Sequence, residues 1–247
     1  MLQPAQRIYA HFPWCEKKCP YCDFNSHTGG FDDTRYADAL LAEYDARAHE
    51  VQGPLRSIYF GGGTPSLWAP EEVGRVLRRF EALGLADDVE ITLEANPGTV
   101  VADRFKAYVD QGVNRFSIGV QSFLQNELDL LGRIHDADQA ERAIRGAKAS
   151  GARVSFDLIY GLPGQSRAQA AESIDRALSL EPEHLSAYAL TIEPETAFGR
   201  RHRLGLFKPM PEDGQAELMQ WVGERLAEAG LPRYEISSYA AAGNEAR

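Results

Sequence analysis

The chain has 247 residues, a formal net charge of −10 and an apolar fraction of 44%, which is ordinary for a globular protein and allows a full hydrophobic core. We expect one domain over residues 1–247, because single α/β barrels often reach this length. The negative charge disfavours nucleic acid and anionic membranes as partners, since both attract basic surfaces.

The cellular compartment is expected to be the cytoplasm. No run approaches the ~18 apolar residues of a membrane helix, and the stretch Met1–Arg7 lacks the apolar segment of a signal peptide. The three cysteines are odd in number and closely spaced, which does not suit a disulfide framework and favours a reducing environment. We therefore expect a cytoplasmic protein without an integral membrane segment.

Six short apolar runs punctuate the sequence. They are rich in Ile, Val, Phe and Tyr, as buried strands are. The predicted strands cover residues 7–12, 56–60, 89–94, 115–120, 153–160 and 185–191.

Helical patterns separate these strands. Tyr36, Leu40, Leu41 and Tyr44 form the first apolar stripe, and Pro70 opens the second helix with acidic residues in its first turn. A third helix is expected around Phe105. The remaining helices are marked by Asp136 as a start and Gly151 as a stop, by a capping box at residues 166–169, and by an apolar stripe at Leu218, Val222 and Leu226.

Strand–helix alternation implies parallel pairing with right-handed crossovers. Six units are two short of a closed (β/α)8 barrel, so we expect an open (β/α)6 partial TIM barrel. The connections near residues 29–33 and 198–211 are expected to be loops. In such barrels the chemistry lies at the carboxyl ends of the strands.

All three cysteines lie in the loop after the first strand, at Cys15, Cys19 and Cys22. Thiolates select iron–sulfur clusters, zinc or copper(I). A [4Fe–4S] cluster normally takes four cysteines, so one iron would be open to a small molecule. The alternative is a structural zinc site with His11 or His27 as the fourth ligand.

Polar residues follow the other strands. Gly61-Gly62-Gly63-Thr64-Pro65 follows the second strand, and its glycines allow close backbone approach to a ligand. No Gly-Lys-Ser/Thr follows, so this is no Walker phosphate loop. Glu94 ends the third strand and Gln121 the fourth.

Two charged residues complete this set. Asp157 lies between apolar neighbours in the fifth strand, where an unpaired carboxylate is costly, so it needs a partner such as ligand hydroxyls. The guanidinium of Arg133 suits a carboxylate.

These motifs resemble a known family. C-x3-C-x2-C after a first strand is similar to the signature of the radical S-adenosylmethionine (radical SAM) enzymes. The string Y-x-H-x-P-W-C-x3-C-P-Y-C-D-F-N-S-H resembles the branch that holds the oxygen-independent coproporphyrinogen III oxidases and the HemW-type haem chaperones. G-G-G-T-P, E-A-N-P, G-V-Q-S-F, L-x-R-x-H and D-L-I-Y-G-L-P-x-Q follow in the same order.

The resemblance implies a [4Fe–4S] cluster on the three cysteines and SAM bound at the open iron. One-electron reduction would cleave SAM to methionine and a 5′-deoxyadenosyl radical. The resemblance assigns no catalytic residue. The residues that match SAM contacts of this branch are Tyr9, Tyr21, Gly62, Gly63, Thr64, Glu94, Gln121, Arg133, Asp157 and Ala189.

Phe24 is a departure from the oxidases, which carry a cysteine there, whereas the chaperones carry Asp-Phe. The resemblance therefore favours a haem chaperone that carries haem to haem-accepting proteins and takes electrons from a donor protein. The alternatives are a coproporphyrinogen III dehydrogenase acting on the porphyrinogen and a zinc-stabilised barrel without redox activity. The haem-binding stretch and C-terminal domain of the chaperones would lie beyond Arg247, so no haem ligand is assigned.

Overall fold

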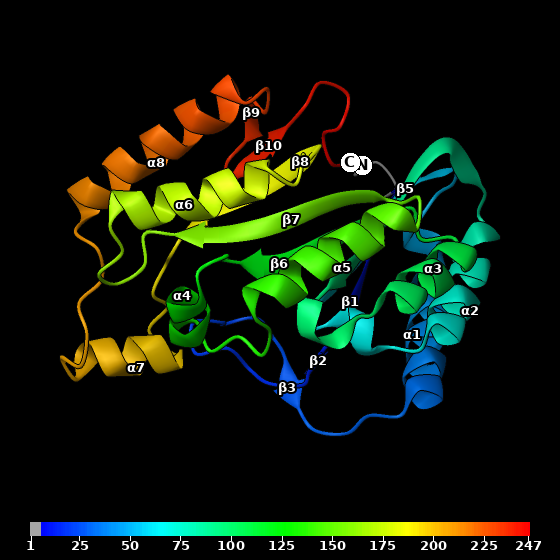
Figure 1. Cartoon of the computed structure of the whole chain (residues 1–247). Coiled ribbons are helices and arrows are strands. Elements are labelled where there is room, and N and C mark those ends of the chain that lie inside the picture. Colours follow the sequence, from blue (N-terminus) through cyan, green and yellow to red (C-terminus); the bar gives the residue numbers. More distant parts are fainter. Residues whose placement is uncertain (1–5) are drawn as a thin grey trace.

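Six parallel strands form the centre of the fold, neighbours in chain order and curled into an open half-barrel (Figure 1). The computed structural model describes residues 6–247. All six predicted strands are confirmed, since each apolar run forms a strand of this sheet. The strands are β1 (Arg7–Phe12), β4 (Leu55–Gly62), β5 (Leu85–Ala95), β6 (Arg115–Gln121), β7 (Arg153–Tyr160) and β8 (His184–Ala189).

Helices cover the outer face of this sheet (Figure 1). The six predicted helices are present as α1 (Asp33–Arg47), α2 (Pro70–Glu81), α3 (Ala102–Asp110), α5 (Ala137–Ala149), α6 (Arg167–Leu178) and α8 (Glu212–Glu228). The capping box at Ser166 is confirmed, and Asp136 starts α5 with a second one. The predicted open (β/α)6 partial barrel is therefore the observed fold.

Aromatic side chains join the first strand to its neighbours. The ring of Phe12 lies 5.5 Å from that of Tyr36 on α1 and 5.7 Å from that of Trp68, between ring centroids. Phe12 and Trp68 are almost fully buried. Burial of such a side chain contributes about 1.5–3 kcal/mol, so this cluster fixes the strand from which the cysteine loop leaves.

The prediction of a loop over residues 198–211 is partly wrong. Residues Ala197–Arg203 form helix α7, whose first turn is capped by the Thr196 hydroxyl accepting from the Gly199 N–H at 3.1 Å. A second short helix, α4 (Gln125–Leu130), follows β6. Short 3-10 turns follow α1, β4 and β5: η1 (Ala48–Glu50), η2 (Pro65–Leu67) and η3 (Pro97–Thr99).

Four short strands complete the fold. β10 (Ser238–Ala240) pairs antiparallel with β8, and β9 (Arg233–Glu235) pairs antiparallel with β10. β2 (Trp14–Cys15) and β3 (His27–Thr28) pair with each other on either side of the cysteine loop. The sequence patterns did not predict these strands.

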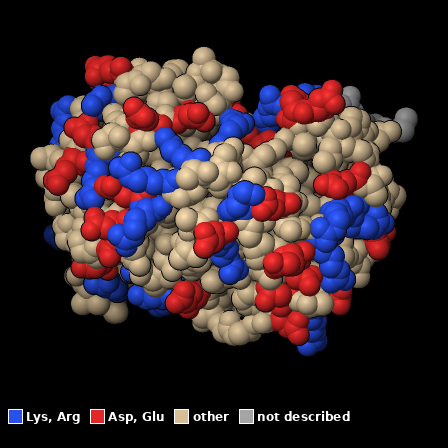
Figure 2. Space-filling model, turned by 45° about the vertical axis from the view of Figure 1, so that its right-hand side comes forward, with Lys and Arg blue, Asp and Glu red and all other residues tan. Residues whose placement is uncertain are grey.

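Acidic and basic side chains are interspersed on the face shown in Figure 2. Between residues 6 and 247, no helix has both the length and the apolar character that a membrane span requires. The prediction that no signal-peptide segment is present concerned Met1–Arg7. Residues 1–5 of that stretch lie outside the described residues.

Candidate functional site

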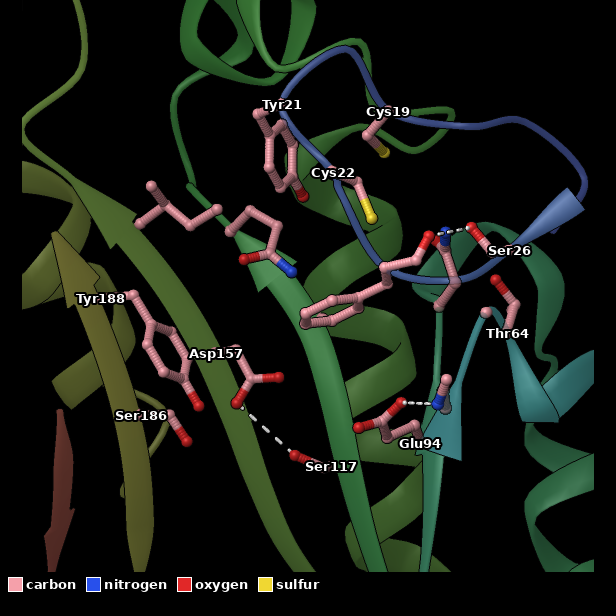
Figure 3. A pocket seen from close by; sticks show the side chains of 18 of the residues that line it. Cys19, Tyr21, Cys22, Ser26, Thr64, Glu94, Ser117, Asp157, Ser186 and Tyr188 are labelled. Carbon is pink, nitrogen blue, oxygen red and sulfur yellow. Dashed lines mark hydrogen bonds between the residues drawn. The ribbon is translucent and has the colours of Figure 1, made fainter. Parts of the chain in front are cut away.

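The cysteine loop lies over the carboxyl ends of the strands (Figure 3). Cys15 ends β2, and the Cys22 N–H donates to the Cys19 carbonyl oxygen at 3.1 Å in a tight turn. All three thiols are free and half-buried, and all three line one cavity of about 510 Å³. Three soft ligands therefore face a single space.

The placement of the three thiols is compatible with a polynuclear cluster, because cluster thiolates each bind a separate iron and need only face one space. Neither His11 nor His27 lines the cavity. His11 uses both ring nitrogens, with the Asn25 carbonyl oxygen at 2.8 Å and the Tyr9 hydroxyl at 3.0 Å.

The glycine-rich loop after β4 holds the start of the cysteine loop. The Gly63 N–H donates to the Phe12 carbonyl oxygen at 2.6 Å, and the Thr64 N–H donates to the Trp14 carbonyl oxygen at 2.8 Å. A Cβ on Gly63 would lie only 2.5 Å from that Trp14 oxygen. Gly62 has φ of +121°, which favours glycine. Glycine is therefore required at both positions for the two segments to meet.

Glu94 links the ends of β4 and β5. Its carboxylate accepts from the Tyr59 hydroxyl at 2.8 Å and from the Gly62 N–H at 3.0 Å. Burial raises the pKa of Glu94 to about 7, although these two hydrogen bonds act in the opposite direction. This carboxyl group is therefore close to half-ionised at neutral pH, and its two bonds fix the glycine-rich loop against β5.

Asp157 faces the same cavity from β7 (Figure 3). Burial raises its pKa to about 6, while hydrogen bonding from the hydroxyls of Ser186 and Ser117 opposes that shift. The Ser117 hydroxyl lies 3.5 Å from its carboxylate, a long contact. Asp157 is therefore mainly ionised at neutral pH and retains capacity to accept hydrogen bonds from a ligand.

Arg133 follows α4 and lies against the cysteine loop. Its Nη2 donates to the Gly119 carbonyl oxygen at 2.7 Å, and its Nη1 lies 3.4 Å from the Cys19 Sγ. Its buried Nε has no hydrogen-bond partner among the described residues. Tyr21 lies beside it, and burial raises the pKa of this phenol. A fixed positive charge thus adjoins one thiol at the wall of the cavity.

Every site residue predicted from the sequence lines the cavity except Tyr9. Tyr9 is 59% exposed on β1 and bonds to His11, so its proposed ligand contact stays a prediction. Gln121 and Ala189 lie at the ends of β6 and β8, and Gln121 has φ of +72°, unusual for a residue with a side chain.

The sequence interpretation missed the polar residues deeper in the barrel. Arg115 and Ser117 lie two residues apart on β6, and His184, Ser186 and Tyr188 have the same spacing on β8; all five line the cavity. Every second side chain of a strand points to the same face, so this alternation was the available signal. Burial together with Arg115 and Arg153 lowers the pKa of His184 to about 3, which keeps its ring neutral.

Known proteins are similar to this chain in sequence. The chain is 45% identical over 246 residues to "Heme chaperone HemW" of Escherichia coli (strain K12) and 42% identical over 249 residues to that of Haemophilus influenzae, with 97% of this chain and 64% of each relative covered. It thus spans just under two thirds of these relatives' length.

Among solved structures, the coproporphyrinogen III oxidase HemN from Escherichia coli, described as a radical SAM enzyme, has a TM-score of 0.82 and 25% identity, covering 96% of this chain and 56% of that one. The family model "Radical SAM superfamily" matches residues 9–177. Because that match covers more than half of its length, the chain belongs to the radical SAM superfamily.

Proposed function

We propose that this chain holds a [4Fe–4S] cluster through Cys15, Cys19 and Cys22 and binds SAM beside it. The observation that carries the proposal is that the three thiols of one loop face a cavity walled by the polar carboxyl ends of the strands. Three cysteines leave one iron of a four-iron cluster without a protein thiolate, and that position would take the amino and carboxylate groups of SAM.

The bound cluster would supply the electron for reductive cleavage of SAM, and the protein would supply binding and orientation. The glycine-rich loop at Gly62 and Gly63 presents its backbone to the amino group of SAM. Arg133 places a guanidinium beside Cys19, where its positive charge stabilises thiolate ligands and attracts the carboxylate of SAM. Asp157 accepts from ligand hydroxyls, such as those of a ribose.

The proposed biological role is that of a haem chaperone that delivers haem to acceptor proteins. The names of the two HemW relatives support this role, and so does Phe24, which is 62% exposed and lines the cavity. An aromatic ring there offers a flat apolar surface to a macrocycle. The alternative, coproporphyrinogen III dehydrogenase, draws support from the structural likeness to HemN.

Metal analysis of the anaerobically reconstituted protein tests the proposal. We expect about four irons and four sulfides per chain, a reduced-cluster signal in electron paramagnetic resonance, and a change of that signal when SAM is added. About one zinc per chain, as in a structural site, and no iron after anaerobic preparation would contradict it.

A further inference from the structure

An exposed basic and apolar surface lies beside the cysteine loop. It consists of Arg200, Arg201, Arg203, Leu204, Leu206 and Lys208, and we call it the α7 patch. Leu204 and Leu206 are 73% and 65% exposed. Residues 197–208 contain no Asp or Glu, and Glu193, Glu195, Glu212 and Asp213 flank them in the chain. The patch is therefore a cluster of basic side chains, bordered by acidic residues, on an acidic protein.

The charges of the patch face solvent without acidic partners. Arg200 and Arg203 donate to the backbone carbonyl oxygens of Glu195 and Pro194. The guanidinium of Arg201 lies 5.5 Å from the centre of the Phe207 ring. Among residues 6–247, no carboxylate lies within 4.0 Å of a cationic nitrogen of the patch. The backbone bonds hold the arginines in place and leave their charge available to a partner.

The patch is joined directly to the cysteine loop. The Phe198 N–H donates to the carbonyl oxygen of Pro20 at 2.8 Å, and Pro20 adjoins Cys19 in the chain. The Phe198 ring lies 6.4 Å from the Tyr21 ring and 5.1 Å from the Phe207 ring. α7 lies at the same end of the molecule as β2, β3 and α4 (Figure 1). One hydrogen bond and a short covalent stretch thus connect the patch to a thiol of the proposed cluster.

We propose that the α7 patch is the docking surface for a small acidic one-electron carrier protein, an inference that rests on the proposed function. One electron leaves the reduced carrier, which is oxidised by one electron, and the cluster gains that electron; no bond or proton changes place. Apolar side chains ringed by charges form an interface with an apolar centre and a polar rim. Redox encounters use small interfaces, and opposite charges accelerate their formation.

A charge-reversal variant tests the docking directly. The double variant Arg201→Glu/Lys208→Glu reverses two charges of the patch without removing the backbone bonds of Arg200 and Arg203. Its matched control, Arg35→Glu/Arg142→Glu, makes the same change in net charge at exposed arginines of α1 and α5. The probe is an oxidised, acidic plant-type ferredoxin, and its binding to each reconstituted protein is measured by biolayer interferometry at low and physiological salt.

We expect wild-type protein and control to bind the ferredoxin, more weakly at higher salt, and the patch variant to bind at least about tenfold more weakly at low salt. The same loss should appear in the rate at which photoreduced ferredoxin reduces the cluster, whereas dithionite should reduce all three proteins alike. Absence of ferredoxin binding to the wild type, or equal binding and reduction in the patch variant, overturns the docking surface. Absence of iron and sulfide from the reconstituted wild type would instead contradict the proposed function.

Discussion

Cys19 lies in the middle of the cysteine loop, against Arg133, and is the most direct residue with which to test the proposed cluster. Cys19→Ala should remove the brown chromophore and most of the iron, because two thiolates hold a four-iron cluster poorly. Iron, sulfide and ultraviolet-visible absorption after anaerobic reconstitution measure the effect. Glu16→Ala, an exposed position on the same loop, is the control and should keep its iron; equal iron in both variants would show that Cys19 is no ligand.

Arg133 lines the cavity and is held in place by a bond from its Nη2 to the Gly119 carbonyl oxygen. Arg133→Ala should weaken SAM binding by on the order of 1.5–3 kcal/mol, because a charge-assisted hydrogen bond is lost. That is roughly a tenfold to hundredfold loss of affinity. Calorimetry on the reconstituted protein measures it, with Arg142→Ala as the control. Unchanged SAM affinity in the Arg133 variant at equal iron content would place SAM elsewhere.

Asp157 gives the site a pH dependence. Its pKa is raised to about 6, so the carboxylate becomes protonated, and a weaker hydrogen-bond acceptor, as the pH falls through that value. SAM affinity in the wild type should fall by about tenfold between about pH 7 and about pH 5. The Asp157→Asn variant should bind SAM more weakly than the wild type at neutral pH. It should also lose the part of the pH dependence that protonation of Asp157 causes.

Glu94, whose pKa is raised to about 7 by burial and in part by the negative charge of Asp157, titrates in the same range, so both pH profiles are measured in a Glu94→Gln background, where their difference isolates Asp157. Calorimetric titrations across this range give both profiles. Parallel profiles would show that Asp157 does not accept from SAM.

Residues at strand ends were predictable from the sequence, because the carboxyl end of each parallel strand opens on the same side of the barrel. Glu94 and Gln121 were found in this way, whereas Asp157 was found as a carboxylate between apolar neighbours within a strand. The residues that these side chains contact were not predictable. Arg133 was expected to bind a ligand carboxylate, and only the fold shows that its Nη1 lies against Cys19, since these residues are far apart in the chain. Tyr9 sits on the edge strand β1, outside the cavity lining.

At the scale of elements, the glycine-rich loop is the support of the cysteine loop. Gly63→Ala would place a Cβ about 2.5 Å from the Trp14 carbonyl oxygen, so the two segments must separate at a cost of about 1–3 kcal/mol. We expect a melting temperature lower by about 2–4 °C per kcal/mol and weaker retention of iron.

Gly30→Ala is the matched control for this loop. A Cβ at Gly30 would meet nothing within 4 Å, and the residue has no positive φ. Thermal unfolding followed by circular dichroism, together with iron content, compares the two variants with the wild type. Equal melting temperature and iron content in the Gly63 variant would show that the close backbone approach does not constrain the cysteine loop.

Long elements with a regular pattern were predictable, and short elements were not. The strand over residues 153–160 and the capping box at Ser166 follow from local sequence. Helix α7 has only seven residues and several arginines, so it shows no apolar stripe; its cap at Thr196 and the burial of Phe198 stabilise it. β10 depends on pairing with β8, a contact between segments that no local pattern encodes.

At the scale of the whole molecule, the barrel does not decide the biological role. The chain matches relatives named haem chaperones and also a coproporphyrinogen III oxidase structure. A shared fold supports different functions, which depend on residues at the site. The difference visible here is Phe24, where the oxidases that the sequence resembles have a cysteine. Its side chain lines the cavity from the cysteine loop, close to the proposed chemistry.

We predict that this protein does not decarboxylate coproporphyrinogen III. A phenyl ring at Phe24 cannot replace a thiol as a hydrogen-bond donor, a metal ligand or a redox group. The assay combines the reconstituted protein with SAM, a reductant and coproporphyrinogen III under anaerobic conditions, and chromatography measures protoporphyrinogen IX. HemN from Escherichia coli serves as the positive control. Product formed by this chain at a rate comparable to that of HemN would favour the dehydrogenase over the chaperone, whereas its absence beside an intact cluster with bound SAM supports a carrier of haem.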